Sequence, residues 1–300
     1  MTLASPRIVR TARAIARPAE RNAMTFVDSP PAATADTPPI TLAGVTKDFV
    51  TDSGDTVHAV AQVDLAIEPG EFVCIVGPSG CGKSTLMDMV AGFLPPTGGT
   101  VSVGERVVTA PGQDRGVVFQ QPNLFPWMSV RHNVELGPRL RGVRARERRE
   151  LAERFLTLVG LEQFMERRPY ELSGGMQQRC QIARVLANDP EVILMDEPFG
   201  ALDALTRERL QLELLEIWRQ KRKTVIFITH SVDEAIFLGT RVLVMSARPG
   251  RVILDQPVHL AGPEAGSELR SLPEFVALRD KVSAAIYAAQ NVHGATPVDH

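Results

Sequence analysis

A glycine-rich stretch with a lysine is the most specific chemical signal in the sequence. Residues 77–85 read GPSGCGKST and fit the pattern G-x-x-x-x-G-K-[ST]. They follow a continuous apolar run at 72–76 and precede an apolar helical pattern at 86–90, which is the strand-to-helix context that the motif requires. Glycines allow several backbone N–H groups to converge on a phosphate at a helix N-terminus, so we expect a nucleotide to bind here.

Individual roles follow from the chemistry of the loop residues. We expect the Lys83 ammonium between the β- and γ-phosphates, the Ser84 hydroxyl on Mg²⁺ and Thr85 at the α-phosphate. A Gly-rich turn with only a structural role is the alternative, but it does not require Lys and Ser at these places. The expected nucleotide-binding residues of this loop are Gly77, Pro78, Ser79, Gly80, Cys81, Gly82, Lys83, Ser84 and Thr85.

Two adjacent carboxylates form the second candidate group. Asp196 and Glu197 end an apolar run at 192–195, where a doubly wound sheet presents its ligand-binding edge. Asp196 suits the coordination shell of Mg²⁺, and Glu197 suits a general base for the attacking water. Two solvated carboxylates at a strand end are the alternative, which the phosphate loop makes less fitting.

A second anion site is suggested by residues 172–179, which read LSGGMQQR. Ser173 precedes a helical pattern, so its hydroxyl and the free N–H groups of Gly174 and Gly175 can bind an anion. A Ser-Gly-Gly before a helix is on its own an ordinary N-cap. Together with the phosphate loop and the carboxylate strand, however, this segment resembles the signature of ATP-binding cassette (ABC) transporter ATPases.

The resemblance implies ATP as ligand, Mg²⁺ as cofactor and a head-to-tail homodimer. The signature residues Ser173, Gly174, Gly175 and Gln177 of one subunit would close on the γ-phosphate held by the other subunit. Gln120 resembles the Q-loop residue, which would contact Mg²⁺ and the water, and His230 resembles the switch histidine at the γ-phosphate.

Three further positions complete this comparison with the family. Asp203 resembles the D-loop aspartate. Phe49 stands where the family usually has an adenine-stacking tyrosine, and it keeps the stacking face without the hydroxyl. Gly200 replaces a frequent serine of the D-loop.

The elements that position these residues are short apolar runs alternating with helical patterns. Such alternation predicts an α/β fold with a mostly parallel, covered core sheet. The resemblance implies the P-loop NTPase fold of ABC ATPases, with an antiparallel β subdomain and an inserted α-helical subdomain. Leu65 and Ile67 are assigned to one short strand. The runs assigned to the core sheet are 72–76, 117–119, 192–195, 224–228 and 242–245.

Composition changes mark the expected domain boundaries. Residues 1–38 are Arg- and Pro-rich and are predicted to be a disordered extension, with either Met1 or Met24 as the true start. Residues 39–262 are the expected ABC ATPase domain, in which 121–175 form the helical subdomain. Residues 263–300 are expected to be a C-terminal helical appendage, with Phe275, Leu278, Val282 and Ile286 on one face.

The composition also limits which partners and which compartment are expected for this protein. Thirty-three basic and 35 acidic residues give a net charge of −2, which gives no reason to expect nucleic acid as a partner. The dense arginines from 139 to 149 are read as a solvated helix face. Three cysteines lie far apart in sequence and suit a reducing compartment, and no apolar run is long enough to span a bilayer.

Four segments extend the resemblance to the ATPases of nitrate, sulfonate and taurine importers: 112–120, 124–127, 197–207 and 246–251. This implies an ATPase at the cytoplasmic face of the inner membrane that drives permease subunits and, indirectly, a periplasmic solute-binding protein. The solute stays open, and an importer of another solute is the first alternative. A soluble non-transport ABC ATPase is the second, but about 90 residues without sustained heptads separate the phosphate loop from the signature, where such proteins insert long coiled coils.

Overall fold

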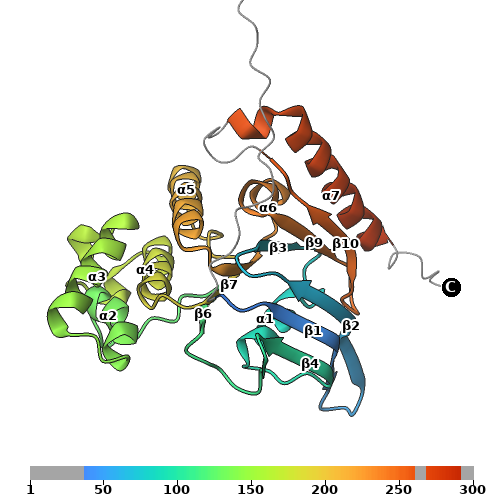
Figure 1. Cartoon of the computed structure of the whole chain (residues 1–300), viewed down its shortest axis with the longest axis horizontal. Helices are drawn as coiled ribbons and strands as arrows, with labels where there is room; N and C mark the ends of the chain where they lie inside the picture. Colours follow the sequence, from blue (N-terminus) through green and yellow to red (C-terminus); the bar gives the residue numbers. More distant parts are fainter. Residues whose placement is uncertain (1–36, 261–267, 292–300) are drawn as a thin grey trace, which may run out of the picture.

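Two sheets and a helical lobe make up the molecule (Figure 1). The computed structural model describes residues 37–260 and 268–291. The predicted disordered extension therefore lies outside the described residues apart from 37 and 38. Of the predicted C-terminal appendage, only 268–291 can be compared with the structure.

The core sheet has six strands in the order β10-β9-β3-β8-β7-β6. Five of them run parallel, and only β10 joins its neighbour β9 in the antiparallel direction. Every residue of β3, β7 and β8 is buried, as expected for parallel strands covered on both faces. The predicted α/β fold with a mostly parallel sheet is thus confirmed. The strands are β3 (Phe72–Val76), β6 (Arg115–Val118), β7 (Val192–Asp196), β8 (Thr224–Ile228), β9 (Arg241–Met245) and β10 (Val252–Pro257).

The second sheet is antiparallel, with the order β2-β1-β4-β5. The short strand expected around Leu65 and Ile67 is wrong in length, because β2 spans twelve residues. Its first half breaks the alternation, because Ala59 and Val60 are buried in succession and the other residues there are exposed or half-buried, so it carries little period-2 signal. The strands are β1 (Ile40–Val50), β2 (Thr56–Ile67), β4 (Gly98–Val103) and β5 (Arg106–Val107).

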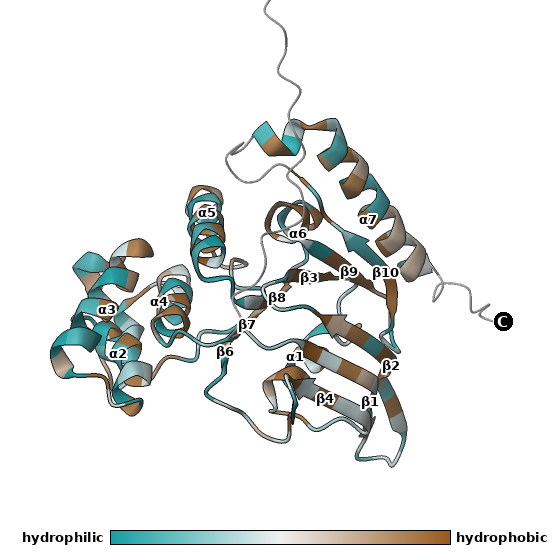
Figure 2. Ribbon diagram, viewed as in Figure 1, coloured by the Kyte–Doolittle hydropathy of each residue, from teal (hydrophilic) through white to brown (hydrophobic). Residues whose placement is uncertain are grey.

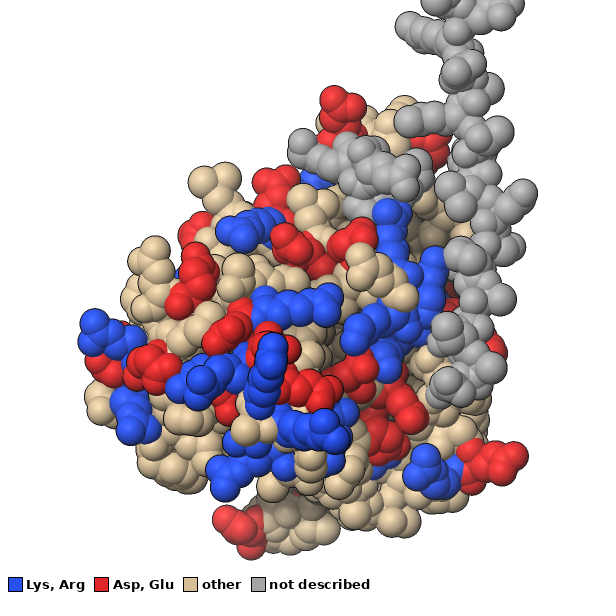
Figure 3. Space-filling model, turned by 60° about the vertical axis from the view of Figure 1, so that its left-hand side comes forward, with Lys and Arg blue, Asp and Glu red and all other residues tan. Residues whose placement is uncertain are grey.

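The helical lobe lies on the left in Figure 1 and interrupts the sheet between β6 and β7. Ion pairs cover its surface: Arg146 pairs with Glu150 at 2.9 Å and Arg148 with Glu135 at 3.2 Å. The face in Figure 3 accordingly mixes acidic and basic side chains. The lobe consists of α2 (Val130–Leu140), α3 (Ala145–Leu158), the 3-10 turns Glu162–Phe164 and Pro169–Glu171, and α4 (Gly174–Ala187).

Four more helices flank the core sheet: α1 (Lys83–Ala91), α5 (Ala204–Lys221), α6 (Val232–Leu238) and α7 (Pro273–Asn291). Helix α7 packs beside α6, β9 and β10 and buries Phe275 and Val282 completely. Apolar residues concentrate in the central strands, whereas the outer helix faces are hydrophilic (Figure 2). None of the described helices is long and apolar enough to cross a membrane.

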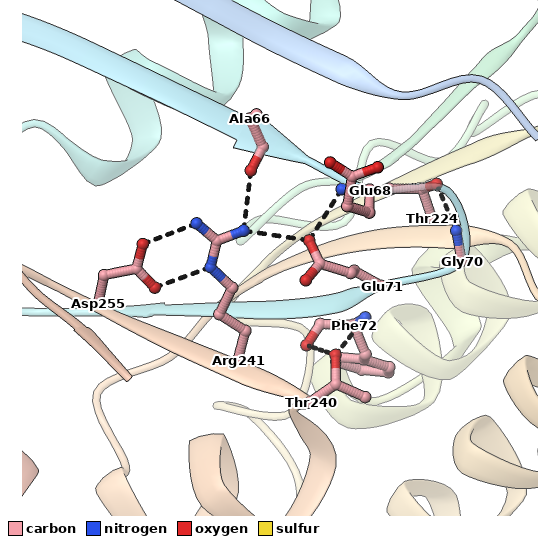
Figure 4. Close-up of polar contacts among 9 residues, drawn as sticks. All are labelled: Ala66, Glu68, Gly70, Glu71, Phe72, Thr224, Thr240, Arg241 and Asp255. Carbon is pink, nitrogen blue, oxygen red and sulfur yellow. Dashed lines mark hydrogen bonds and ion pairs between the residues drawn. The ribbon is translucent and has the colours of Figure 1, made fainter. Parts of the chain in front are cut away.

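Arg241 at the start of β9 ties the two sheets together (Figure 4). Its Nε and Nη2 donate to the two carboxylate oxygens of Asp255 on β10, both at 2.7 Å. Its Nη1 donates to the Ala66 carbonyl on β2 at 2.8 Å and to Glu71 at 3.2 Å. Hydrogen bonding to this guanidinium lowers the pKa of Asp255.

Candidate functional site: a nucleotide-binding edge of the core sheet

The loop of residues 77–82 joins the buried strand β3 to helix α1. Gly77 has φ +154° and Gly82 has φ +97°, conformations that L side chains rarely adopt. A Cβ at Gly77 would lie 2.6 Å from the Met245 carbonyl oxygen, and one at Gly82 would lie 2.9 Å from that of Ala59. The loop is therefore wrapped closely by neighbouring backbone, and only glycine fits at these two places.

Lys83, the first residue of α1, folds back over this loop. Its side chain is buried, and its Nζ donates to the carbonyl oxygens of Gly77 at 3.0 Å and Pro78 at 2.9 Å. The thiol of Cys81 lies 3.7 Å from the same nitrogen. Ser84 is exposed at the start of the helix, and Thr85 is half-buried beside it. The ammonium thus lies at the concave side of a loop rich in backbone N–H groups, which suits a polyphosphate.

The strand order explains why distant motifs meet here. Strands β3, β8, β7 and β6 are consecutive neighbours and parallel, so their carboxyl ends share one edge. Opposite Asp196 at the end of β7 lies Ile228 of β8, and opposite Met195 lies Val118 of β6. The phosphate loop, the histidine turn, the carboxylates and Gln120 therefore follow one another along this edge.

Glu197 contacts two other predicted site residues. Its Oε1 lies 2.5 Å from His230 Nε2, and its Oε2 accepts a hydrogen bond from Gln120 Nε2 at 3.1 Å. Its backbone has φ +48°, a left-handed conformation that is uncommon for glutamate and turns the chain sharply after β7. The structure thus brings Gln120, Glu197 and His230 together, although 77 residues separate the first two in sequence.

Asp196 and Ser84 are the residues that could hold a metal ion. Asp196 is 8% exposed, and its Oδ1 is buried without a hydrogen-bond partner among the described residues. Burying a carboxylate oxygen without a hydrogen-bond partner is unfavourable unless a bound ligand interacts with it. The site therefore fits a hard cation that takes oxygen ligands. In the described part of the chain, no three His, Cys, Asp or Glu residues cluster as a metal site, so Ser84, Gln120 and phosphate oxygens would have to supply other ligands.

Asp88 is a site neighbour that the sequence analysis missed. It lies on α1, and its pKa is raised by burial and, to a smaller extent, by the negative charge of Asp196. No motif in the sequence marks Asp88. The negative charge of a second carboxylate thus adds to that of Asp196 in this part of the molecule.

The segment 246–251, which the sequence analysis named only for its family resemblance, contacts the phosphate loop directly. Gly250 donates its N–H to the Ala59 carbonyl, and its own carbonyl accepts from the Ala61 N–H at 2.9 Å. A Cβ on Gly250 would lie only 2.0 Å from the carbonyl oxygen of Cys81. The same segment sends Arg248 Nη2 to the Gly80 carbonyl at 3.4 Å.

The signature residues belong to the helical lobe, at the start of α4. Ser173 caps this helix by accepting from the Met176 N–H at 3.3 Å, and Gly174 and Gly175 form its first turn. Gln177 turns back instead, since its Nε2 donates to the carbonyls of Pro169 and Leu172. Ser173 and its two glycines therefore offer an N-terminal anion site, whereas the Gln177 amide is engaged inside its own subunit.

Among the residues that the structure describes, Asp203 and Phe49 make no hydrogen bond or ion pair with the other predicted site residues. Asp203 is the N-cap of α5 and accepts from the Thr206 N–H at 3.0 Å, which lowers the pKa of its carboxyl. Phe49 is 40% exposed at the end of β1, with the Lys47 ammonium 5.2 Å from its ring centroid. An exposed ring beside a cation leaves a face available for stacking.

Taken together, the parallel sheet, the glycine loop with Lys83 and the carboxylates at the strand ends define a P-loop nucleotide-hydrolysing enzyme. Comparison with known proteins identifies the family. Residues 60–200 match the ABC transporter family. The chain is 53% identical over 232 residues to an ATP-binding protein of Brucella abortus, covering 77% of this chain and 89% of the relative.

Two further matches carry informative names. The taurine import ATP-binding protein TauB of Rhizobium johnstonii is 49% identical over 251 residues, covering 82% of this chain and 96% of the relative. A solved ATP-binding cassette dimer in a post-hydrolysis state, bound to ADP and Pi, is 35% identical with a TM-score of 0.66 and covers 73% of this chain and 98% of its own. The chain belongs to the ABC transporter family and is an ABC-type ATPase that binds ATP. This confirms the family resemblance, the fold and the enzyme class expected from the sequence.

Proposed function

We propose that this ATPase energises the import of a small anion, of the taurine, sulfonate or nitrate type, through partner permease subunits. The observation that carries this proposal is the similarity to TauB proteins, which reaches 46–49% identity over 88–96% of the length of three such relatives. In the proposed importer, partner subunits contact the solute, and the ATPase subunit does not. Similarity between ATPase subunits therefore does not identify the solute, which requires a transport experiment.

For the hydrolytic step, we propose that Glu197 is the general base that activates the attacking water. Its carboxylate is held at both oxygens by Gln120 and His230, which restricts its rotation at the edge of the sheet where the phosphate loop also lies. Lys83 would exchange its two carbonyl partners for β- and γ-phosphate oxygens, and the loop N–H groups would complete the anion site. His230, half exposed beside Glu197, would hydrogen-bond the γ-phosphate.

Mg²⁺ is part of the proposal because the residues present fit it. Ser84, Gln120 and Asp196 would hold the ion, and the unpartnered Oδ1 of Asp196 is the observation that supports this assignment. When bound, Mg²⁺ neutralises charge that develops on the phosphate oxygens. The protein contributes a buried oxygen that is already desolvated and oriented by the end of β7.

The separation of the two anion sites supports a working dimer. Ser173, Gly174 and Gly175 start α4 in the helical lobe on the left in Figure 1, whereas the phosphate loop leads into α1, which packs against strands of both sheets. One nucleotide does not need both sites of one chain, but a head-to-tail pair of copies would place the signature of each on the ATP of the other. Asp203 and its helix α5 would lie near this junction.

Permease docking is assigned to the helical lobe near Gln120. Several exposed aromatic side chains support this assignment: Trp127 is 68% exposed and Tyr170 is 74% exposed. Phe93 stacks on Phe119, directly before Gln120, with ring centroids 5.6 Å apart. Apolar groups at this place suit a partner helix, and the protein would thus be peripheral to the membrane on its cytoplasmic side.

Uptake measurements test the proposal. Cells with and without this gene are compared for uptake of labelled taurine, an alkanesulfonate and nitrate, and Lys83→Ala serves as the control that retains the protein without nucleotide binding. Loss of uptake for one solute, restored by the wild-type gene only, is the expected result. Unchanged uptake of all three would overturn the solute class, and purified protein without ATPase activity would overturn the catalytic assignment.

A further inference from the structure

A buried chain of hydrogen bonds lies behind the turn that carries His230. Its centre is Glu234 in the first turn of α6, which is 7% exposed. Its Oε2 accepts from the Thr229 hydroxyl, and its Oε1 accepts from Gln211 Nε2 at 2.7 Å. Gln211 belongs to α5, is 2% exposed, and in turn accepts a hydrogen bond from Arg270 Nη2 at 3.1 Å. The chain therefore joins the end of β8, α6, α5 and the segment before α7.

The same chain holds both neighbours of His230. The Thr229 hydroxyl accepts the Ser231 N–H at 3.0 Å while it donates to Glu234. The Ser231 hydroxyl accepts the Glu234 N–H at 3.2 Å. The turn at His230 is thus closed by two residues that both depend on Glu234, whereas the His230 side chain itself is 51% exposed.

The surroundings of Glu234 explain why its partners matter. Burial raises the pKa of its carboxyl, and the hydrogen bonds from Thr229 and Gln211 act against this shift. The positive charges of Arg207 on α5 and Arg270 also oppose it, and the Cys74 thiol faces it from β3. A buried carboxylate that lost a hydrogen-bond donor would be left poorly solvated. Each residue of this hydrogen-bond network therefore restricts the position of its neighbours.

We propose that Glu234 is a positioning residue for His230, and that its link through Gln211 to Arg270 makes the C-terminal segment part of the hydrolytic machinery. The proposal rests on the proposed role of His230 at Glu197 and the γ-phosphate. Because the histidine ring is half exposed, few packing contacts orient it. Its placement 2.5 Å from Glu197 depends instead on the turn that Thr229, Glu234 and Ser231 close.

Steady-state ATPase kinetics of two Thr229 variants test this proposal. Thr229→Val has nearly the same shape but lacks the hydroxyl, whereas Thr229→Ser retains it. We expect Thr229→Val to lower kcat about tenfold, which corresponds to about 1.4 kcal/mol, and to leave KM for ATP within about twofold. Thr229→Ser should restore most of the loss. If Thr229→Val lowered only the unfolding temperature and left kcat unchanged, the hydrogen-bond network would have only a structural role and the proposal would be wrong.

Arg270 supplies a second test, at a position where its guanidinium also lies 5.1 Å from the Phe237 ring centroid. Arg270→Met removes the donor to Gln211 and keeps an unbranched apolar side chain that can still pack on this ring, and Arg279→Met on α7 is the matched control, since Arg279 contacts only its neighbour Asp280 among the described hydrogen bonds. We expect about threefold lower kcat for Arg270→Met and no change for Arg279→Met. Equal kcat in both variants would overturn the contribution of the C-terminal segment.

His230→Ala separates failure of this inference from failure of the proposed function. If His230→Ala keeps full turnover, the proposed role of His230 is wrong and the positioning role falls with it. If His230→Ala loses turnover while both Thr229→Val and Arg270→Met retain it, the proposed function stands and the positioning chain alone is refuted.

Discussion

His230 Nε2 lies 2.5 Å from Glu197 Oε1, while Gln120 holds the other oxygen of the same carboxylate at 3.1 Å. These contacts join residues that follow three neighbouring strands, β8, β7 and β6. A shift of any of these strand ends would therefore change the orientation of Glu197. This geometry gives the catalytic assignment a direct test.

Glu197→Gln should lower ATP turnover by about a hundredfold or more, because the amide cannot accept a proton from water. The amide keeps the shape of the side chain, so ATP binding and the contacts between copies should survive. We expect this variant to accumulate as an ATP-bound dimer, detected by light scattering after size-exclusion chromatography. Lys83→Ala under the same conditions should remain monomeric, and a monomeric Glu197→Gln at saturating ATP would contradict the dimer model.

Gly250→Ala should weaken ATP binding although Gly250 is not among the predicted nucleotide-binding residues. The new Cβ would lie 2.0 Å from the Cys81 carbonyl, so the phosphate loop or segment 246–251 must move. Such overpacking costs about 1–3 kcal/mol, which corresponds to about fivefold to about 150-fold in affinity if the loop moves. Titration with a fluorescent ATP analogue measures it. Gly200→Ala is the control, because its Cβ would meet only the Glu197 carbonyl at 3.5 Å.

Asp255→Asn should destabilise the protein at neutral pH and not in acid. The pKa of Asp255 is lowered by Arg241, so the ion pair contributes stability above the unfolded-state pKa near ~4 and loses it as the pH falls through the lower folded-state value. Since the carboxylate is 43% exposed, solvent screening limits the effect to about 0.5–1 kcal/mol.

Urea unfolding at pH 7 and at progressively lower pH tests this pair, and the difference from wild type should shrink toward pH 3. Asp280→Asn, in an exposed pair with Arg279, is the matched control and should have little effect at either pH. A difference that grew in acid would refute the assigned sign.

Phe275→Ala should show that α7 is an integral part of the core. The Phe275 side chain is fully buried, and truncating a buried phenylalanine costs about 3–5 kcal/mol. Tyr287→Ala on the same helix removes a ring that is 67% exposed and should change the unfolding free energy by no more than about 0.5 kcal/mol. Similar small effects of both variants in denaturant unfolding would mean that α7 is dispensable for the fold.

The parallel strands were predictable because every residue of β3, β7 and β8 is buried, which leaves a continuous apolar run in the sequence. The N-terminal half of β2 was not, because its buried and exposed residues do not alternate and β1 pairs with it through register shifts. Helix α2 was not identified as a separate helix, since it contains Pro138 near its end.

Some residues of the candidate site were likewise predictable from the sequence and others were not. Gln120, Glu197 and His230 each follow a recognisable strand, so their convergence follows from the parallel sheet. The link from Glu234 to Gln211 spans 23 residues, and that from Gln211 to Arg270 spans 59, with no local pattern that connects them. The left-handed backbone of Glu197 likewise has no signature in a residue type that seldom adopts it.

The two carbonyl partners of Lys83 have a consequence for ligand selectivity. The two carbonyl dipoles already solvate the ammonium, so a weakly held anion gains little by displacing Gly77 and Pro78. Inorganic phosphate offers one anionic group, whereas a triphosphate offers several that engage the loop N–H groups at the same time. The loop is therefore expected to favour a polyphosphate over abundant small anions.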